Sequence, residues 1–335
     1  MNIFTRTHRA VSILVVLFLA TSGCSLMLGR EDANPFGFFL VYKETLRNEA
    51  SLQGEGLKDL AYATDRAGTL QRPNSVFADQ FRVYVTDATP ARVFLFDRGT
   101  RTATVVAIPA APSEGSLVSP TGIVADVAGT IFVSDSQQGR VFGYDRSGKL
   151  LYVLGRFGEF AFPSGLAIDT VRNRLYITDA QAHQVKVFDM LGNRLFDISG
   201  SGKKEDSFKF PGAVVIARNG DLYVLDTLRR GVYVYDPDGI YMRTISVASA
   251  DTASGVAIQP KGVALDSDGH LYVTDAVSNT ILVFDKDGRF LFTWGKTGSL
   301  NGDFWTPAGI FIDEHDQIYI ADQTNGRVQV FQYVK

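Results

Sequence analysis

Residues 163–189 read PSGLAIDTVRNRLYITDAQAHQVKVFD. Three short runs within this stretch, SGLAID, LYITD and QVKVFD, have the alternation and the β-branched and aromatic residues typical of strands. The middle run recurs six times, and the final Asp residues of the copies lie 44 to 49 positions apart. The copies are VYVTD (83–87), IFVSD (131–135), LYITD (175–179), LYVLD (222–226), LYVTD (271–275) and IYIAD (318–322). A supersecondary unit repeated at this period indicates a solenoid or a propeller.

Every copy has the same surroundings. A Pro precedes the copy, a run such as RVFLFD (92–97) or TILVFD (280–285) follows it, and a fourth strand such as RLFDIS (194–199) follows that run. Asp-x-Asp-Gly segments supply the tight turns between strands. We therefore predict an all-β fold, a six-bladed β-propeller of four-stranded antiparallel blades. The sequence contains no Gly-Gly doublet, as kelch repeats require, and only two Trp, too few for WD40 repeats.

The combined pattern Pro-x-Gly-φ-φ-φ-Asp, φ-Tyr-Val-x-Asp and Arg-Val-x-Val-Phe resembles the NHL-repeat family of six-bladed propellers. The resemblance covers residues 73–335 and is closest in residues 163–189 and 307–331. The implied blades start near residues 73, 120, 163, 211, 260 and 307. The resemblance implies the fold but says little about activity, since one fold carries many functions. Some proteins of similar architecture are metal-dependent lyases or lactonases, and some intracellular NHL proteins bind RNA.

The last repeat ends at its third strand, because the chain stops at Lys335. An outer strand must come from elsewhere, or the edge of that blade stays unpaired. The apolar run GFFLVY (37–42) is the predicted donor, so that residues 36–72 form a closing strand and a linker. One short helix is expected in this linker, near residues 56–62.

The N-terminus has the layout of an export signal. Two arginines precede the apolar run at residues 10–20, and TSGC, with the only Cys of the chain, follows it. Ser22 and Gly23 before Cys24 resemble the lipobox of bacterial lipoproteins, although Thr21 stands where that motif usually has Leu. The resemblance implies that residues 1–23 are a cleaved signal peptide and that Cys24 carries lipid, palmitate included. Residues 24–35 would be the tether. The alternative is a plain secretory signal with an incidental Cys.

The predicted cleavage before Cys24 sets the net charge of the mature chain, and the residue after Cys24 bears on its localisation. The whole chain has a net charge of −3, and without residues 1–23 it has 31 basic and 36 acidic residues, a net charge of −5. Such a charge argues against nucleic-acid partners, which prefer basic surfaces. Ser25, rather than Asp, follows Cys24, which favours anchoring in the outer membrane of a Gram-negative bacterium over retention in the inner membrane.

Propellers bind ligands where the loops between second and third strands meet the loops between blades. Each of the six loops between second and third strands begins with an Asp, and this uniform repetition favours a structural role for it. Residues that vary between the copies are the better candidates for a binding site. These candidates are Arg229, Arg230, His183, Gln181, Gln138, Asn325 and Lys261. Adjacent arginines suit a carboxylate or phosphate group, whereas the alternative is that both are solvated surface residues.

No metal site and no cofactor are predicted. His183 falls at the opposite end of the blades from His270 and His315, so the three cannot share one ion. The residues that follow the six prolines include one cation, Lys261, and no carboxylate. Carboxylates between blades leave a calcium site open; they are Glu114, Glu159, Asp251 and Asp303. The aromatic residues before the prolines are interpreted as inter-blade core; they are Phe157, Phe160, Phe162, Phe208, Phe210, Phe304 and Trp305.

Together these observations predict a lipid-anchored, extracytoplasmic propeller that serves as a binding or scaffolding module. Its partner would be a protein, a peptide or a cell-envelope glycan, engaged through the loops at one end of the blades. The alternative is a propeller hydrolase or lyase, lactonase-like or amidating-lyase-like, with a site in the mouth of the channel.

Overall fold

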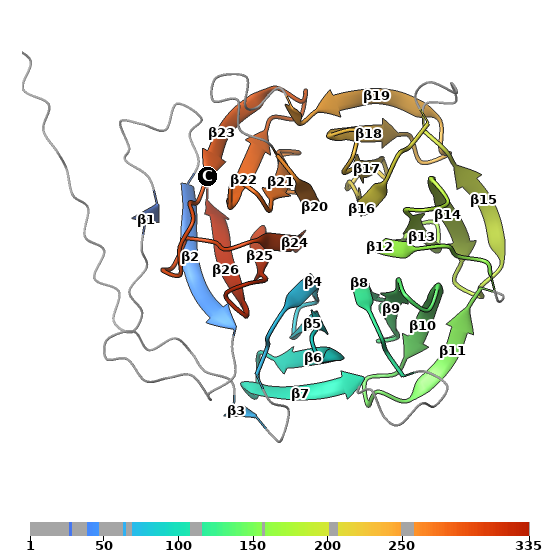
Figure 1. Cartoon of the computed structure of the whole chain (residues 1–335), viewed down its shortest axis with the longest axis horizontal. Coiled ribbons are helices and arrows are strands. Elements are labelled where there is room, and N and C mark those ends of the chain that lie inside the picture. The colour runs from blue at the N-terminus through green and yellow to red at the C-terminus, as the bar shows by residue number, and fades with distance from the viewer. Residues whose placement is uncertain are drawn as a thin grey trace, which may run out of the picture.

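The computed structural model describes residues 27–28, 39–46, 63–64, 69–107, 116–155, 158–200, 207–248 and 258–334. In these residues six sheets, mainly antiparallel, stand around a central channel, which confirms the predicted fold class (Figure 1). No α-helix occurs among them, and the helix expected near residues 56–62 lies outside the described residues. None of the described segments forms a helix of the length and hydrophobicity needed to cross a membrane.

Each blade has four strands in the predicted order. The inner strands, which line the channel, are β4 (Pro73–Ala78), β8 (Pro120–Ala125), β12 (Pro163–Asp169), β16 (Pro211–Ile216), β20 (Pro260–Leu265) and β24 (Pro307–Ile312). The second strands are β5 (Arg82–Ala88), β9 (Ile131–Asp135), β13 (Arg174–Asp179), β17 (Leu222–Asp226), β21 (Leu271–Asp275) and β25 (Gln317–Asp322). The third strands are β6 (Ala91–Asp97), β10 (Arg140–Tyr144), β14 (Gln184–Asp189), β18 (Gly231–Tyr235), β22 (Thr280–Phe284) and β26 (Arg327–Val334).

The outer strands complete the blades, which we number 1 to 6 from β4 to β24. Five of them follow the third strand of their own blade, namely β7 (Thr102–Ala107), β11 (Leu150–Leu154), β15 (Arg194–Ile198), β19 (Tyr241–Ser246) and β23 (Phe290–Trp294). In blade 6 the outer position is taken by β2 (Phe39–Leu46), which pairs antiparallel with β26. Residues 37–42 were predicted for this position; residues 37–38 lie outside the described residues, and the strand continues to Leu46. The N-terminal segment therefore joins the last blade (Figure 1).

Two blades have more strands than the sequence predicted. A short strand, β1 (Met27–Leu28), pairs with β2, and another, β3 (Ala63–Thr64), pairs in parallel with β7. Blades 1 and 6 are thus five-stranded. Both strands have only two residues, too few for hydrophobic alternation to mark them in the sequence.

The repeated motif explains how the blades pack against each other. The aromatic residue of the middle run is at most 9% exposed in all six copies and contributes to the apolar clusters between blades; these residues are Tyr84, Phe132, Tyr176, Tyr223, Tyr272 and Tyr319. The Gly of the Pro-x-Gly pattern permits close approach of the inner strands. A Cβ atom at Gly122 would lie 2.2 Å from the Ser164 carbonyl oxygen of the next blade.

Hydroxyl groups also join neighbouring inner strands. Thr274 Oγ1 accepts a hydrogen bond from the Gly262 amide at 2.8 Å and donates one to the Ala308 carbonyl of the next blade at 2.6 Å. Equivalent contacts occur at Thr86, Ser134 and Thr178. Leu225 and Ala321 occupy this position in blades 4 and 6, so the contact is specific to four of the six described blades.

Candidate functional site

One end of the propeller collects the variable loops. Pro163 lies opposite Asp179, and Pro260 lies opposite Asp275. The start of each inner strand is therefore beside the end of the second strand. We letter the four strands of a blade a to d, from the inner strand outward. The b–c loops then join second and third strands. We call this end of the propeller the b–c face, and it consists of the b–c loops and the loops that precede the inner strands.

The six Asp residues that begin the b–c loops are structural, as the repetition indicated. All six are completely buried; they are Asp87, Asp135, Asp179, Asp226, Asp275 and Asp322. Each accepts at least one backbone amide from the loop before its inner strand, as Asp179 does from Ala161 and Phe162 at 2.9 and 2.8 Å. The Asp residues hold the two kinds of loop together, and they are unavailable to a ligand.

The environment of these carboxyl groups differs between blades. Burial raises the pKa of Asp87 despite its amide hydrogen bonds. Burial also acts to raise the pKa of Asp179, but the hydrogen bond from Lys186 and the two loop amides outweigh it, so this pKa is lowered. The Lys186 ammonium lies 2.8 Å from Asp179 and is itself buried. The pair is therefore a satisfied internal ion pair.

Three of the predicted ligand-binding residues bind their own chain. They occupy the same place, three residues after the loop Asp. Gln138 donates to the Ser116 carbonyl at 2.7 Å, Arg229 to the Ser207 carbonyl at 2.9 Å, and Asn325 to the Gly298 carbonyl at 2.9 Å. In each blade the acceptor lies in the loop before the inner strand. These contacts give Gln138, Arg229 and Asn325 a structural role within the b–c face.

The next position in the b–c loop has a left-handed backbone. It is Gly139 in blade 2 and Gly326 in blade 6, but His183 in blade 3, Arg230 in blade 4 and Asn279 in blade 5. His183 has a φ of 58° and Arg230 a φ of 52°, and both side chains are exposed, as is that of Gln181. Residues other than Gly rarely adopt this conformation. Two adjacent blades therefore present large polar side chains where the backbone favours glycine.

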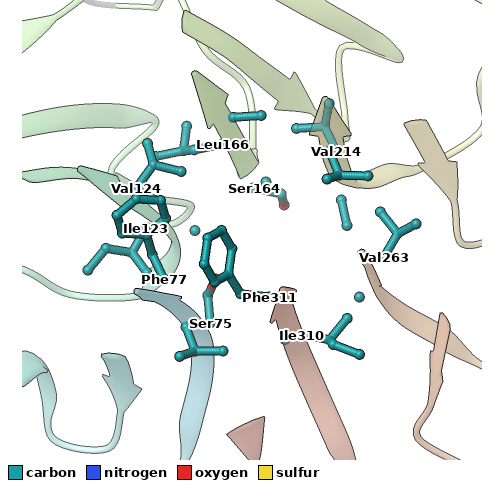
Figure 2. Close-up of a pocket in the computed structure, with 18 of the residues that line it drawn as sticks. Ser75, Phe77, Ile123, Val124, Ser164, Leu166, Val214, Val263, Ile310 and Phe311 are labelled. Carbon is teal, nitrogen blue, oxygen red and sulfur yellow. The ribbon is translucent and has the colours of Figure 1, made fainter. Parts of the chain in front are cut away.

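A cavity runs through the channel from the b–c face. Its volume is about 470 Å³, and the inner strands of all six blades line it (Figure 2). Lys261, as predicted, lies at the mouth together with Phe162, Phe210 and Thr227. Lys261 is the only charged residue among the described lining residues. Desolvation by the surrounding protein lowers its pKa, although the side chain is reached by solvent.

The aromatic residues before the prolines divide into three groups. Phe160, Phe208 and Phe304 are buried between blades, as the sequence analysis expected. Phe162 and Phe210 are only half-buried; their rings pack 5.9 Å apart and border the channel mouth. Trp305 is 51% exposed, so the core interpretation was wrong for this residue. Phe157 lies outside the described residues. The lining role of Phe162 and Phe210 was missed, because the same spacing marks buried and lining residues alike.

The histidines lie at the predicted ends. His270 and His315 are in turns at the end opposite the b–c face. His270 Nδ1 lies 2.8 Å from Asp266 Oδ2, and this hydrogen bond raises the pKa of His270. Asp266 also accepts from Tyr272 at 3.0 Å, while Tyr333 of β26 donates to Asp268 at 2.6 Å. This cluster fixes a turn of blade 5 to blade 6.

Carboxylates near the b–c face do not gather at one point. Among the described residues no group of three His, Cys, Asp or Glu side chains could hold a metal ion. Glu159 is paired with Arg194 at 2.6 Å, and Asp303 is nearly buried, with Lys296 4.0 Å away. Glu114 and Asp251 lie outside the described residues.

Two parts of the chain match known protein families. Residues 160–188 match the NHL repeat, and residues 251–333 match a family described as a 6-bladed beta-propeller. The human NHL repeat-containing protein 2 is 24% identical over 174 residues, which are 42% of this chain and 24% of that protein. The chain spans between about a tenth and a quarter of the curated relatives it matches.

Solved structures share the architecture at low identity. An auxiliary nutrient binding protein from Bacteroides ovatus superposes with a TM-score of 0.61 at 15% identity, covering 81% of this chain and 71% of that one. Virginiamycin B lyase from Staphylococcus aureus superposes with a TM-score of 0.57 at 12% identity, covering 78% and 95%. At these identities the likeness shows the fold alone. The chain is therefore an all-β, six-bladed propeller that contains an NHL repeat in its third blade.

Proposed function

We propose that the protein is an exported, lipid-anchored binding module at the outer membrane of a Gram-negative bacterium. Its b–c face would engage a protein, a peptide or an envelope glycan. The observation that carries this proposal is the pair of exposed residues with left-handed backbone, His183 and Arg230. A backbone conformation that disfavours side chains is kept by residues other than Gly in blades 3, 4 and 5, and in blades 3 and 4 the side chain is exposed. Such local strain is typical of functional positions.

The surroundings of Arg230 suit recognition of an anionic group. Arg229 beside it is anchored to the Ser207 carbonyl, which leaves Arg230 as the outward-facing member of the pair. Leu228, in the same loop, is 64% exposed and adds apolar surface. Arginine is enriched in protein interfaces relative to the rest of the surface.

The test replaces the strained residues with glycine. Arg230→Gly and His183→Gly relieve the left-handed backbone, so the free energy of unfolding should stay unchanged or rise by up to about 1 kcal/mol. Binding should fall roughly ten- to a hundredfold for Arg230→Gly, because a charge-assisted hydrogen bond is lost. The partner is first captured from envelope extracts with the tagged full chain, and affinities are then measured by titration calorimetry.

Two matched controls accompany this experiment. Asn279→Gly makes the same backbone change in blade 5 but also removes hydrogen bonds with Thr297 and the Thr306 amide, so its free energy of unfolding is measured as well. Lys286→Ala with Arg289→Ala removes charge at the opposite end. Both should bind the partner normally. Weaker binding by the opposite-end variant, with normal binding by Arg230→Gly and His183→Gly, would place the working surface on the other end.

A hydrolase or lyase with a site in the channel mouth is the second candidate. The observation in its favour is Lys261, whose lowered pKa is a property that enzymes use for general acid–base chemistry. The other described lining residues contribute no carboxylate, imidazole or thiol. Lys261 would thus have to perform the proton transfer without a second titratable group, which makes binding the better-supported function.

The anchor is tested separately at Cys24. Labelled palmitate should be incorporated into the wild-type chain and not into Cys24→Ala, because the thiol is the only attachment point in the sequence. Two or more acyl chains give stable membrane anchoring, so the variant should move from the membrane fraction to the soluble fraction. Ser22→Ala, which keeps a small residue before the Cys, serves as the control and should retain the label. Equal labelling of wild type and Cys24→Ala would show that the protein is not a lipoprotein.

A further inference from the structure

The central channel has a polar mouth and an apolar interior. Lys261 and Ser164 follow their prolines directly, so they lie at the same level, next to the b–c face. Deeper residues are aliphatic, and they include Ile123, Leu166 and Val263 (Figure 2). Pockets of about 300–1,000 Å³ that are mainly apolar and carry a few polar groups are typical sites for small molecules. The cavity of about 470 Å³ falls within that range.

Aromatic rings narrow the channel farther from the mouth. Phe77 of β4 and Phe311 of β24 pack with ring centroids 4.8 Å apart, and Figure 2 shows the Phe311 ring projecting toward the middle of the channel. Phe311 stands three residues farther along its strand than Lys261 does along its own. Three residues of a strand span roughly 10 Å. The mouth therefore opens into a short apolar compartment with an aromatic floor.

The cation at the mouth lacks a partner of opposite charge. No hydrogen bond or ion pair joins the Lys261 ammonium to any described residue, and no carboxylate lies among the described lining residues. The Lys261 side chain is exposed at the channel mouth, so an anion can reach its ammonium, and an opposite charge nearby favours the charged form.

A second polar group at the mouth is also unused. The side chain of Ser164 is about nine-tenths buried and borders the cavity, and its hydroxyl makes no hydrogen bond with a described residue, although its carbonyl accepts one from Ser134. A hydroxyl can donate to a carboxylate oxygen. Lys261 and Ser164 thus provide two donors, unused by the described residues, at one level of a mainly apolar cavity.

We propose that the channel binds a small monocarboxylate with an apolar body, its carboxylate at Lys261 and Ser164 and its body against the aliphatic residues and Phe311. This site goes beyond the proposed partner-binding face, since it lies inside the channel and does not use His183 or Arg230. Because Lys261 is the only cation among the described lining residues, the site favours a ligand with a single negative charge. The apolar compartment excludes sugars and polyanions, which could not satisfy their polar groups there.

The probe is octanoate, titrated calorimetrically into the full chain carrying Cys24→Ala. Octanoate should bind with a stoichiometry of one, and octylammonium, of the same length but opposite charge, should bind at least about tenfold more weakly. Lys261→Met keeps an apolar side chain of similar length, removes the charge and should weaken octanoate binding roughly ten- to a hundredfold. Binding of octan-1-ol should be the same in Lys261→Met and in the parent chain.

Lys209→Met is the matched control, because Lys209 is an exposed lysine on the same face that does not line the cavity. It should bind octanoate like the parent chain. The proposal is overturned if octanoate does not bind at millimolar concentration, if Lys261→Met binds it equally well, or if Lys209→Met weakens binding as much. Capture of an envelope partner by the Lys261→Met chain reports on the b–c face independently, so the two proposals can fail separately.

Discussion

Replacing Arg327 with methionine is expected to destabilise the propeller by about 3–5 kcal/mol, because it leaves a buried carboxylate without its countercharge. The Arg327 side chain is 2% exposed, and its Nε lies 2.7 Å from Asp322 Oδ2. Its remaining nitrogens donate to the carbonyls of Ser299, Leu300 and Asp303 at 2.8 to 3.0 Å. Methionine fills part of the space but donates no hydrogen bond, so the Ser299 carbonyl also loses the Arg327 donor, whereas the Leu300 and Asp303 carbonyls keep the Asp303 amide and Gln329.

The repeat supplies a matched control for this experiment. Arg140 occupies the same loop position in blade 2 but is only half-buried, and no ion pair joins it to Asp135 within the described part of that blade. Arg140→Met should therefore change the free energy of unfolding by less than about 1 kcal/mol. Urea denaturation followed by circular dichroism measures both variants. Equal losses at Arg327 and Arg140 would contradict the role given to the buried ion pair.

Deleting β2 (residues 39–46) is expected to remove most of the stability of the ring. Leu40, Tyr42 and Leu46 are almost completely buried. At about 1.5–3 kcal/mol for each buried side chain, their loss amounts to roughly 5–9 kcal/mol, comparable with the entire stability of a typical domain. Leu46 belongs to the cluster that contains residues of both blade 6 and blade 1, so the deletion weakens the contact between the two ends of the ring.

A synthetic peptide of residues 37–48 provides a rescue. It should restore the melting temperature in a concentration-dependent manner, since a ligand that binds only the folded state stabilises it by mass action. Lys43→Ala in the intact chain is the control, because Lys43 is an exposed residue of the same strand. If the shortened chain melts like the full chain, β2 contributes little to closure and the pairing with β26 has no energetic importance.

The fold could be predicted because each level of the repeat points to the same structure. Asp275 recurs in all six copies, Tyr272 is replaced only by Phe132, and Gly262 recurs in four copies, and each has one physical role. Tyr272 packs between blades, Gly262 allows the inner strands to approach closely, and Asp275 binds loop amides. The short strands β1 and β3 could not be predicted, because two residues carry no periodicity. Their positions depend on contacts with β2 and β7 that only the folded ring creates.

The candidate site was predictable only in part. Lys261 was placed correctly at the channel mouth, because its position relative to the regular spacing of the repeat fixes its level in the strand. Arg229 and Asn325 looked like free polar residues, since a sequence does not show which backbone carbonyls lie within reach of a loop side chain. The left-handed position became visible only from the backbone of His183 and Arg230, although the glycines at 139 and 326 were a signal for it.

The pairing of β2 with β26 also determines when, during synthesis of the chain, the sixth blade can form. Leu46 and Val328 are partners, yet 282 residues separate them in the chain. At about 5–20 residues per second, a ribosome needs roughly 15–55 s to make that interval. During this time β2 lacks its partner strand, and its backbone donors and acceptors are not paired with β26. Unpaired strand edges can associate with other chains. The circular architecture therefore leaves residues 39–46 without their native partner strand until β26 has been synthesised.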